Sequence, residues 1–297
     1  MGERRIRRAD DLFPSNTRVA PAGPISPDGV AKAHRLATGR GAAPMKGSAM
    51  NSYSSLTDDF GISMYLASKV DLPTSRETVL HFFESVQKLY PKMTEFEKRD
   101  ANDYLLEEDR DAGSYRWVSI DGRKFCSGFV NPPTLDDADQ QNERFLEMAP
   151  FHLGVSTIDA DALDVVYYFD LNCSGNHDEV VAEALAHDGP LDSLARIPAS
   201  RVLHFQPSMM VALDEACQLQ CRLSVETRTT AYQVRTGNFS ESPISVYFTV
   251  RQFWGKQPFK TFVESYRNQR RIIDELVTEH VIPNVVNPLA KTIGAKQ

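Results

Sequence analysis

The amino-acid sequence predicts an α+β protein of two sheet-plus-helix halves behind a basic N-terminal tail. Several segments alternate apolar and polar residues with a period of two, which is typical of strands. Other segments place apolar residues at helical spacing. We expect the first half to be ferredoxin-like, with a split βαβ pattern. The second half is expected to be a mostly antiparallel sheet with a long C-terminal helix.

Residues 1–56 are predicted to form a disordered tail that is rich in Pro, Gly and Ala. They contain no sustained apolar period, so burial cannot offset the entropy lost on ordering the backbone. Residues 1–50 hold 9 of the 33 Lys and Arg residues but only 4 of the 40 Asp and Glu residues. This basic tail is therefore expected to contact an anionic partner or the acidic body itself. Alternatively, residues 1–49 are an upstream extension of the reading frame before Met50.

The first half, residues 57–190, opens with a predicted strand whose alternating apolar residues run from Ile62 to Val70. Thr74 and Glu77 form a T-x-x-E capping box, which predicts the start of a helix. Pro91 is expected to end this helix, because proline cannot continue the helical hydrogen bonds.

Further elements of the first half follow in order. A short strand is expected near Met93–Lys98. Asp121-Gly122 joins two alternating runs, Tyr115–Ile120 and Arg123–Val130, and this pattern predicts a β-hairpin. Thr134 is a predicted N-cap for a second helix, whose first turn is acidic as the helix dipole prefers.

The first half is predicted to end with the strand Leu163–Leu171 and the short helix Glu179–His187. The resulting order is strand, helix, strand, hairpin, helix, strand, which resembles the split βαβ arrangement. Asp159, Asp161 and Asp164 lack the spacing of a calcium loop, so they are expected to be solvated.

The second half, residues 195–297, begins with an expected short strand at Val202–Phe205. A long strand is expected next, with one apolar face from Val211 to Val225. Its stretch from Cys217 to Arg228 is the cleanest alternation in the chain. A further strand is predicted over Ile244–Trp254, antiparallel to the previous one.

A long helix is predicted to follow these strands and to reach about His280. Pro283 is expected to break it, with Val285–Ile293 continuing as a last broken helix. Its polar side carries a basic cluster that is expected to be solvated or to receive the acidic surface of another copy. The cluster consists of Lys256, Lys260, Arg267, Arg270 and Arg271.

The turn between the last strand and last helix of the first half carries the candidate catalytic residues. Cys173 is a candidate nucleophile, with His177 as its base and Asp178 as the group that orients the base. The spacing matches no thiol-enzyme signature, and a structural alternative competes with it. In that alternative Gly175 makes the turn, Asn176 or Asp178 caps the helix, and Cys173 is a small apolar side chain.

No cofactor and no metal site are predicted. The 7 histidines have no metal-ligand spacing, and the chain has no Gly-rich phosphate loop. The 4 cysteines form no C-x-x-C pair. Cys217 and Cys221 are expected on one face of a single strand, in the protein core. Reduced thiols and the lack of a secretory pattern favour a cytoplasmic location.

The aromatic residues on strands leave two alternatives. Tyr65, Tyr168, Tyr247 and Phe253 belong to the core if both sheet faces are covered. If one face is exposed, they form a surface for a ligand or a protein partner.

These patterns favour a non-catalytic binding, scaffold or assembly protein over an enzyme with a thiol or His/carboxylate site around Cys173 and His177. Its partner is expected to be a second copy or another protein, bound through the N-terminal tail. The acidic body argues against general nucleic-acid binding. The chain has no apolar run of the roughly 20 residues that span a bilayer, so no membrane contact is expected.

Overall fold

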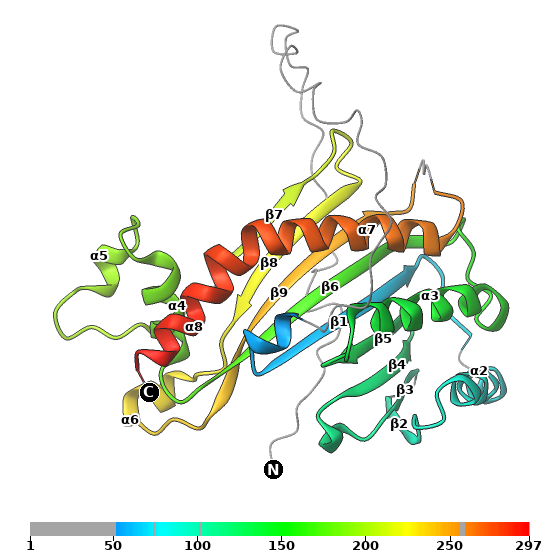
Figure 1. The fold of residues 1–297 in the computed structure, drawn as a ribbon, viewed down its shortest axis with the longest axis horizontal. Helices are drawn as coiled ribbons and strands as arrows, with labels where there is room; N and C mark the ends of the chain where they lie inside the picture. The colour runs from blue at the N-terminus through cyan, green and yellow to red at the C-terminus, as the bar shows by residue number, and fades with distance from the viewer. Residues whose placement is uncertain (1–51, 74, 101, 256–258, 297) are drawn as a thin grey trace, which may run out of the picture. The chain divides into compact units, whose positions relative to one another are not determined.

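One antiparallel sheet runs through both predicted halves in the computed structural model (Figure 1). The structure describes residues 52–73, 75–100, 102–255 and 259–296. The predicted disordered tail therefore lies outside the described residues, apart from its last few. The chain divides into two units, residues 1–48 and residues 49–297. The fold below is that of the second unit.

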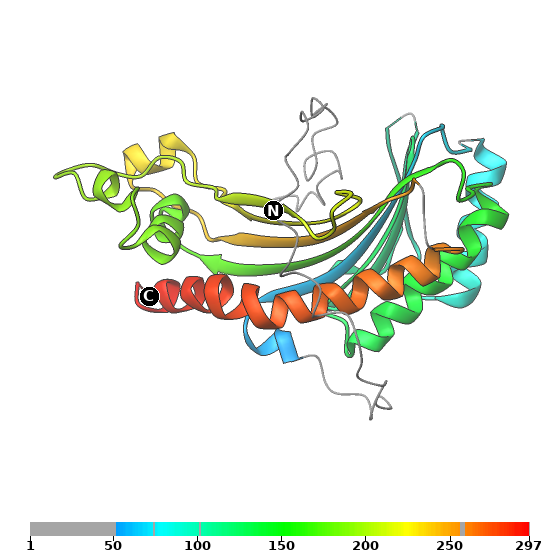
Figure 2. The same ribbon diagram turned by 90° about the horizontal axis from the view of Figure 1, so that it is seen from above.

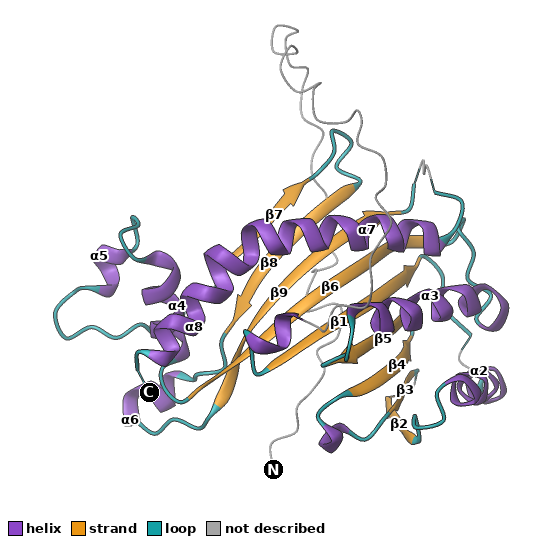
Figure 3. Cartoon of the chain, in the orientation of Figure 1, coloured by secondary structure: helices purple, strands orange, loops and turns teal. Residues whose placement is uncertain are grey.

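Nine strands make up the sheet in the described part of the chain. Their order across the sheet is β2 (Glu95–Asp100), β3 (Asp103–Glu107), β4 (Tyr115–Asp121), β5 (Lys124–Val130), β1 (Asp59–Ser68), β6 (Ala160–Cys173), β9 (Ser242–Phe253), β8 (Leu219–Glu226) and β7 (Ser208–Ala212). Figure 3 shows β2 and β7 at the two edges.

The α+β class and the long C-terminal helix are confirmed, but the two halves share one sheet. β6 of the first half pairs with β9 of the second half from Ala162 and Phe253 to Cys173 and Ser242. The ferredoxin-like arrangement is not confirmed. Every strand pair among the described residues is antiparallel. In a split βαβ unit one strand separates the two strands that the helix joins, whereas three strands (β3, β4 and β5) separate β1 from β2. The predicted division between residues 190 and 195 falls between α4 (His177–Ala186) and β7, while the sheet continues across it.

The main helices cover one face of the sheet, which curves so that α7 (Phe262–Leu276) and α3 (Leu135–His152) lie on the same side (Figure 2). α7 packs on β6 and β9, α3 packs on β5 and β1, and α2 (Arg76–Leu89) packs on α3. The apolar side chains between these layers form one core from both halves of the chain, including Phe60, Phe145, Tyr167, Val250 and Ile273.

The C-terminal helix does not break at Pro283, contrary to the prediction. α7 continues as the π-helical segment η3 (Val277–Val286) and then as α8 (Asn287–Gly294). In an α helix the proline ring clashes with the carbonyl of residue i−4. The wider π winding separates the ring from that carbonyl, so the chain remains helical. None of the described helices is both long and apolar enough to cross a membrane.

Several helix and strand boundaries also differ from the predictions. α2 begins after Ser75, whose side chain accepts the Thr78 N–H, and the predicted cap Thr74 lies outside the described residues. Residues 202–205 form no strand. The expected long strand is instead a hairpin of β7 and β8, with its turn at residues 213–218. Cys217 lies in this turn with a φ of 53° and is exposed, so its assignment to the core was wrong.

Candidate functional site

The turn between β6 and α4 lies where the sequence predicts it, and the three candidate catalytic residues lie in or beside it. β6 ends at Cys173, and α4 begins at His177 behind the N-cap residue Asn176. Asn176 makes no side-chain cap bond and instead donates from Nδ2 to the carbonyl oxygen of Val202, at 2.7 Å. The turn is therefore tied to the chain that leads toward β7.

His177 is buried, and both nitrogens of its ring contact backbone groups. Nε2 lies 3.1 Å from the carbonyl oxygen of Cys173, and Nδ1 accepts the backbone N–H of Arg228 at 3.3 Å. This pattern requires the neutral tautomer with its hydrogen on Nε2. Burial lowers the pKa of His177, in keeping with a neutral ring. The imidazole joins the end of β6 to the segment that follows β8.

Cys173 and Asp178 also make contacts that differ from those of a catalytic triad. Burial raises the pKa of the Cys173 thiol, which disfavours the nucleophilic thiolate. Asp178 is fully buried, and its Oδ1 accepts the Phe205 N–H at 2.7 Å and the Thr227 hydroxyl at 2.8 Å. The catalytic assignment stays a prediction. These contacts favour a structural role for the three residues, but the expected helix cap was wrong, because neither Asn176 nor Asp178 makes a side-chain cap bond to α4.

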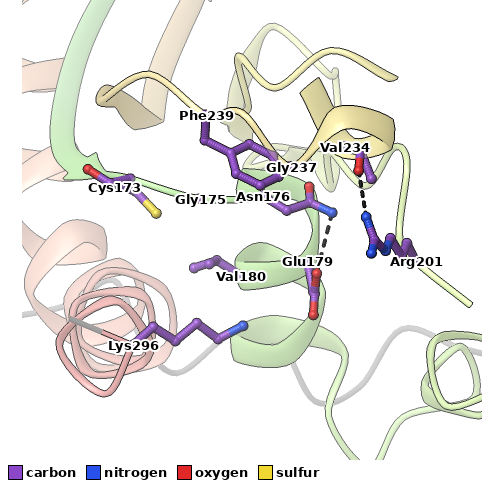
Figure 4. Close-up of a pocket in the computed structure, with 11 residues that line it drawn as sticks. Cys173, Gly175, Asn176, Glu179, Val180, Arg201, Val234, Gly237, Phe239 and Lys296 are labelled. Atoms are coloured by element: carbon purple, nitrogen blue, oxygen red, sulfur yellow. Dashed lines mark hydrogen bonds between the residues drawn. The ribbon is translucent and has the colours of Figure 1, made fainter. Parts of the chain in front are cut away.

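A pocket of about 430 Å³ opens beside this turn (Figure 4). Its charged lining groups already have partners in the chain. Arg201 donates to the carbonyl oxygen of Val234 at 2.7 Å, and Lys296 pairs with Glu183 at 2.7 Å. The pocket is lined by Cys173, Ser174, Gly175, Asn176, Glu179, Val180, Arg201, Val234, Gly237, Phe239 and Lys296.

Among the described residues, one group of side chains has the spacing of metal ligands. His187, Asp188 and Asp192 bring possible ligand atoms within 4.8 Å of one another. The Arg196 guanidinium lies 2.6 Å from Asp192 and 3.6 Å from Asp188, so an internal cation already contacts both carboxylates. The cluster is therefore an exposed ion-pair network.

The strand aromatics lie on the sheet face opposite α2, α3 and α7, which we call the second face. The ring of Tyr168 lies over Gly61, and the indole of Trp117 lies over Gly128. Both rings occupy the space above glycines of a neighbouring strand, where a side chain would have no room. Tyr65 is 9% exposed, and Tyr168, Tyr247 and Phe253 are half-buried. All four lie outside the helix-side core.

Charged residues of the second face are paired within the sheet. Arg251 on β9 donates to both carboxylate oxygens of Asp164 on β6, at 2.7 and 2.6 Å. Asp164 is 4% exposed, so the expectation of a solvated carboxylate was wrong. Burial raises the pKa of Tyr247, on the same face, to about 12.

The two edges of the sheet differ in charge. Five of the six residues of β2 are charged. β7 carries none, and its apolar side chains are exposed: 67% for Met209, 50% for Met210 and 44% for Val211. The uncharged run from Phe205 to Leu213 is visible in the sequence, but it marks an edge only once the strand order is known.

The three arginines of the predicted basic cluster are paired internally. Arg267 lies 2.6 Å from Glu143, Arg270 lies 2.9 Å from Asp139, and Arg271 lies 3.6 Å from Glu275. Lys256 lies outside the described residues. These three arginines are therefore poorly suited to receive an acidic surface of another copy.

Comparison with known proteins gave no match: no protein-family model and no curated protein corresponds to this chain.

Proposed function

We propose that this chain is a non-catalytic binding and assembly protein, and that it binds by adding a partner's strand to the edge strand β7. The observation that carries the proposal is the exposed, uncharged apolar edge. Proteins commonly protect sheet edges with charged residues, short strands or a covering segment, because unpaired backbone groups pair readily with other chains. β2 has charged protection of this kind, whereas none of the five residues of β7 is charged.

The backbone of β7 supports strand addition. Leu213 N–H donates to the Leu219 oxygen at 2.8 Å, and Val225 N–H donates to the Pro207 oxygen at 3.0 Å. In an antiparallel pair, successive residues alternately face the neighbouring strand and face away from it. The odd-numbered residues therefore bond to β8. Ser208, Met210 and Ala212 direct their N–H and C=O groups away from the sheet.

The side chains of β7 supply the rest of such a binding surface. In strand addition, main-chain hydrogen bonds supply affinity and alternate side chains supply specificity. Met209 and Val211 lie on the helix side of the sheet, in register with Leu223 and Cys221 of β8. Met210 lies on the second face, opposite Arg222. Methionine adapts its shape to a partner because its unbranched side chain is flexible.

The proposal includes a cytoplasmic location and a contribution from residues 1–50. All four cysteines are free, which fits a reducing compartment. The basic charge of residues 1–50 favours contact with an acidic region of the partner. An enzyme with a thiol or His/carboxylate site around Cys173 and His177 is the alternative function, and the pocket beside Cys173 is the observation in its favour.

A pair of matched variants tests the proposal. Val211→Lys places a charge on the β7 edge, whereas Val70→Lys makes the same change at a site that is 52% exposed and away from both edges. Sedimentation velocity over a range of concentrations and affinity pull-down measure association of the full chain. We expect Val211→Lys to weaken association at least tenfold and Val70→Lys to leave it unchanged. Deleting residues 1–50 should weaken it in a salt-dependent manner.

A wild-type chain that is monomeric at every concentration and captures no specific partner would contradict the proposal. Equal loss of association in both lysine variants would also contradict it, because the effect would then not belong to the edge.

A further inference from the structure

We infer that the strand added to β7 is the β7 strand of a second copy, paired antiparallel about a two-fold axis through Met210. The inference rests on the proposed function, because it names the partner of that same edge. A two-fold contact requires a self-complementary surface, in which the same patch is used on both copies. The register, side chains and charge of β7 meet that requirement.

The register centred on Met210 uses all five residues of the strand. Ser208 then lies opposite Ala212 of the second copy, and Met210 lies opposite its own equivalent. These three residues face away from β8, so each outward N–H finds a carbonyl of the other copy, with about six hydrogen bonds in all. A register shifted by two or more residues leaves part of the edge unpaired.

The side chains are compatible in the same register. Met209 of one copy lies opposite Val211 of the other, so four exposed apolar side chains gather on the helix side of the joined sheets. Their exposures of 67% and 44% show how much surface is available for burial. Burial of apolar surface contributes roughly 25 cal/mol per Å².

The charge distribution favours a second copy at this edge over any other surface of the chain. Each copy carries a formal net charge of −7, so most surfaces repel one another. The run from Phe205 to Leu213 contains no charged residue, and pairing there brings no like charges into contact. The other edge, β2, would desolvate several charges on pairing. Assembly is therefore expected to stop at the closed dimer.

The expected dimer is weak. Stable interfaces bury about 800 Å² per partner, and a pair of five-residue strands buries less than that. We expect a dissociation constant in the micromolar range, so the dimer forms as the concentration of the protein rises.

Cysteine cross-linking tests the register directly, using the full chain with Cys217→Ser to remove the exposed thiol. In hydrogen-bonded antiparallel pairs the Cα atoms lie about 5.5 Å apart, within the range that a disulfide bridges. Met210→Cys is therefore expected to form a disulfide dimer under mild oxidation. Met209→Cys alone is expected to form little dimer, because each Met209 faces Val211 of the other copy. A mixture of Met209→Cys and Val211→Cys chains should cross-link.

Val70→Cys is the control for random collision, because Val70 is exposed and lies away from β7. The inference is overturned if Met210→Cys stays monomeric, or if Val70→Cys and Met209→Cys cross-link as fast as Met210→Cys does. The proposed function survives that result if Val211→Lys still abolishes binding of a different protein. The proposed function itself is contradicted if Val211→Lys changes neither self-association nor partner binding.

Discussion

His177 Nε2 lies 3.1 Å from the carbonyl oxygen of Cys173, four residues earlier in the chain. The other ring nitrogen accepts the N–H of Arg228, from the segment after β8. One buried imidazole thus holds together the end of β6, the start of α4 and a segment more than 50 residues away. This contact explains why His177 is buried beside a pocket without lining it.

Stability is expected to fall as the pH drops from 7.5 to 5.5, because burial lowers the pKa of His177 in the folded state. An unfolded histidine has a pKa near 6.5, so below that pH the unfolded chain binds a proton that the folded chain resists. One such group changes the free energy of unfolding by at most about 1.4 kcal/mol per pH unit. Urea unfolding at both pH values measures the loss.

His177→Gln should be less stable at pH 7.5, and its stability should change less between the two pH values. His152→Gln is the comparison: burial also lowers the pKa of His152, at the end of α3, so this variant should also reduce the pH dependence. It should lose less stability at pH 7.5, because it keeps both hydrogen bonds of the His177 ring. An identical pH dependence in wild type and His177→Gln would show that the pKa of the His177 ring is not lowered in the folded state.

Thiol alkylation separates the structural role of Cys173 from the enzymatic alternative. Cys217 is exposed, whereas Cys126, Cys173 and Cys221 are buried. We expect iodoacetamide to modify Cys217 in the native protein and the other three only after denaturation. Mass spectrometry of peptides from a time course measures each rate. Labelling of Cys173 in the native protein as fast as Cys217 would support an activated thiol.

Gly61→Ala is expected to destabilise the fold by about 1–3 kcal/mol, the usual cost of overpacking. A Cβ at Gly61 would lie 2.2 Å from the ring of Tyr168. Gly175→Ala is the matched control, because a Cβ there meets nothing within 4 Å. Urea unfolding of both variants checks the difference. If Gly61→Ala costs no more than Gly175→Ala, the ring of Tyr168 does not lie over Gly61 in solution.

Local patterns in the sequence predicted the segments whose two faces differ in polarity. The hairpin of β4 and β5, with a positive φ at Gly122, and the capping of α3 by Thr134 followed from short-range chemistry. β3 was missed because its residues include Asp103 and Glu107. Their burial follows from the pairing of β3 with β2 and β4, in which Glu107 lies opposite Glu95 and Trp117.

The strand order and the contacts of the candidate site could not be predicted in the same way. Asp178 is held by Phe205 and Thr227, which lie 27 and 49 residues further along the chain. β7 reads in sequence as part of a longer strand, and only its place beyond β8 makes it an edge. Long-range pairing of this kind leaves no local periodicity.

Amide hydrogen exchange along β7, followed by NMR as a function of protein concentration, tests the central claim most directly. The amides of Met209 and Val211 bond to β8, so they should be protected at every concentration. The amides of Ser208, Met210 and Ala212 face outward, and they should exchange rapidly at low concentration and slow at least tenfold as β7 pairs. Rapid exchange of these three amides at all concentrations, alone or with any partner, would contradict assembly through the β7 edge.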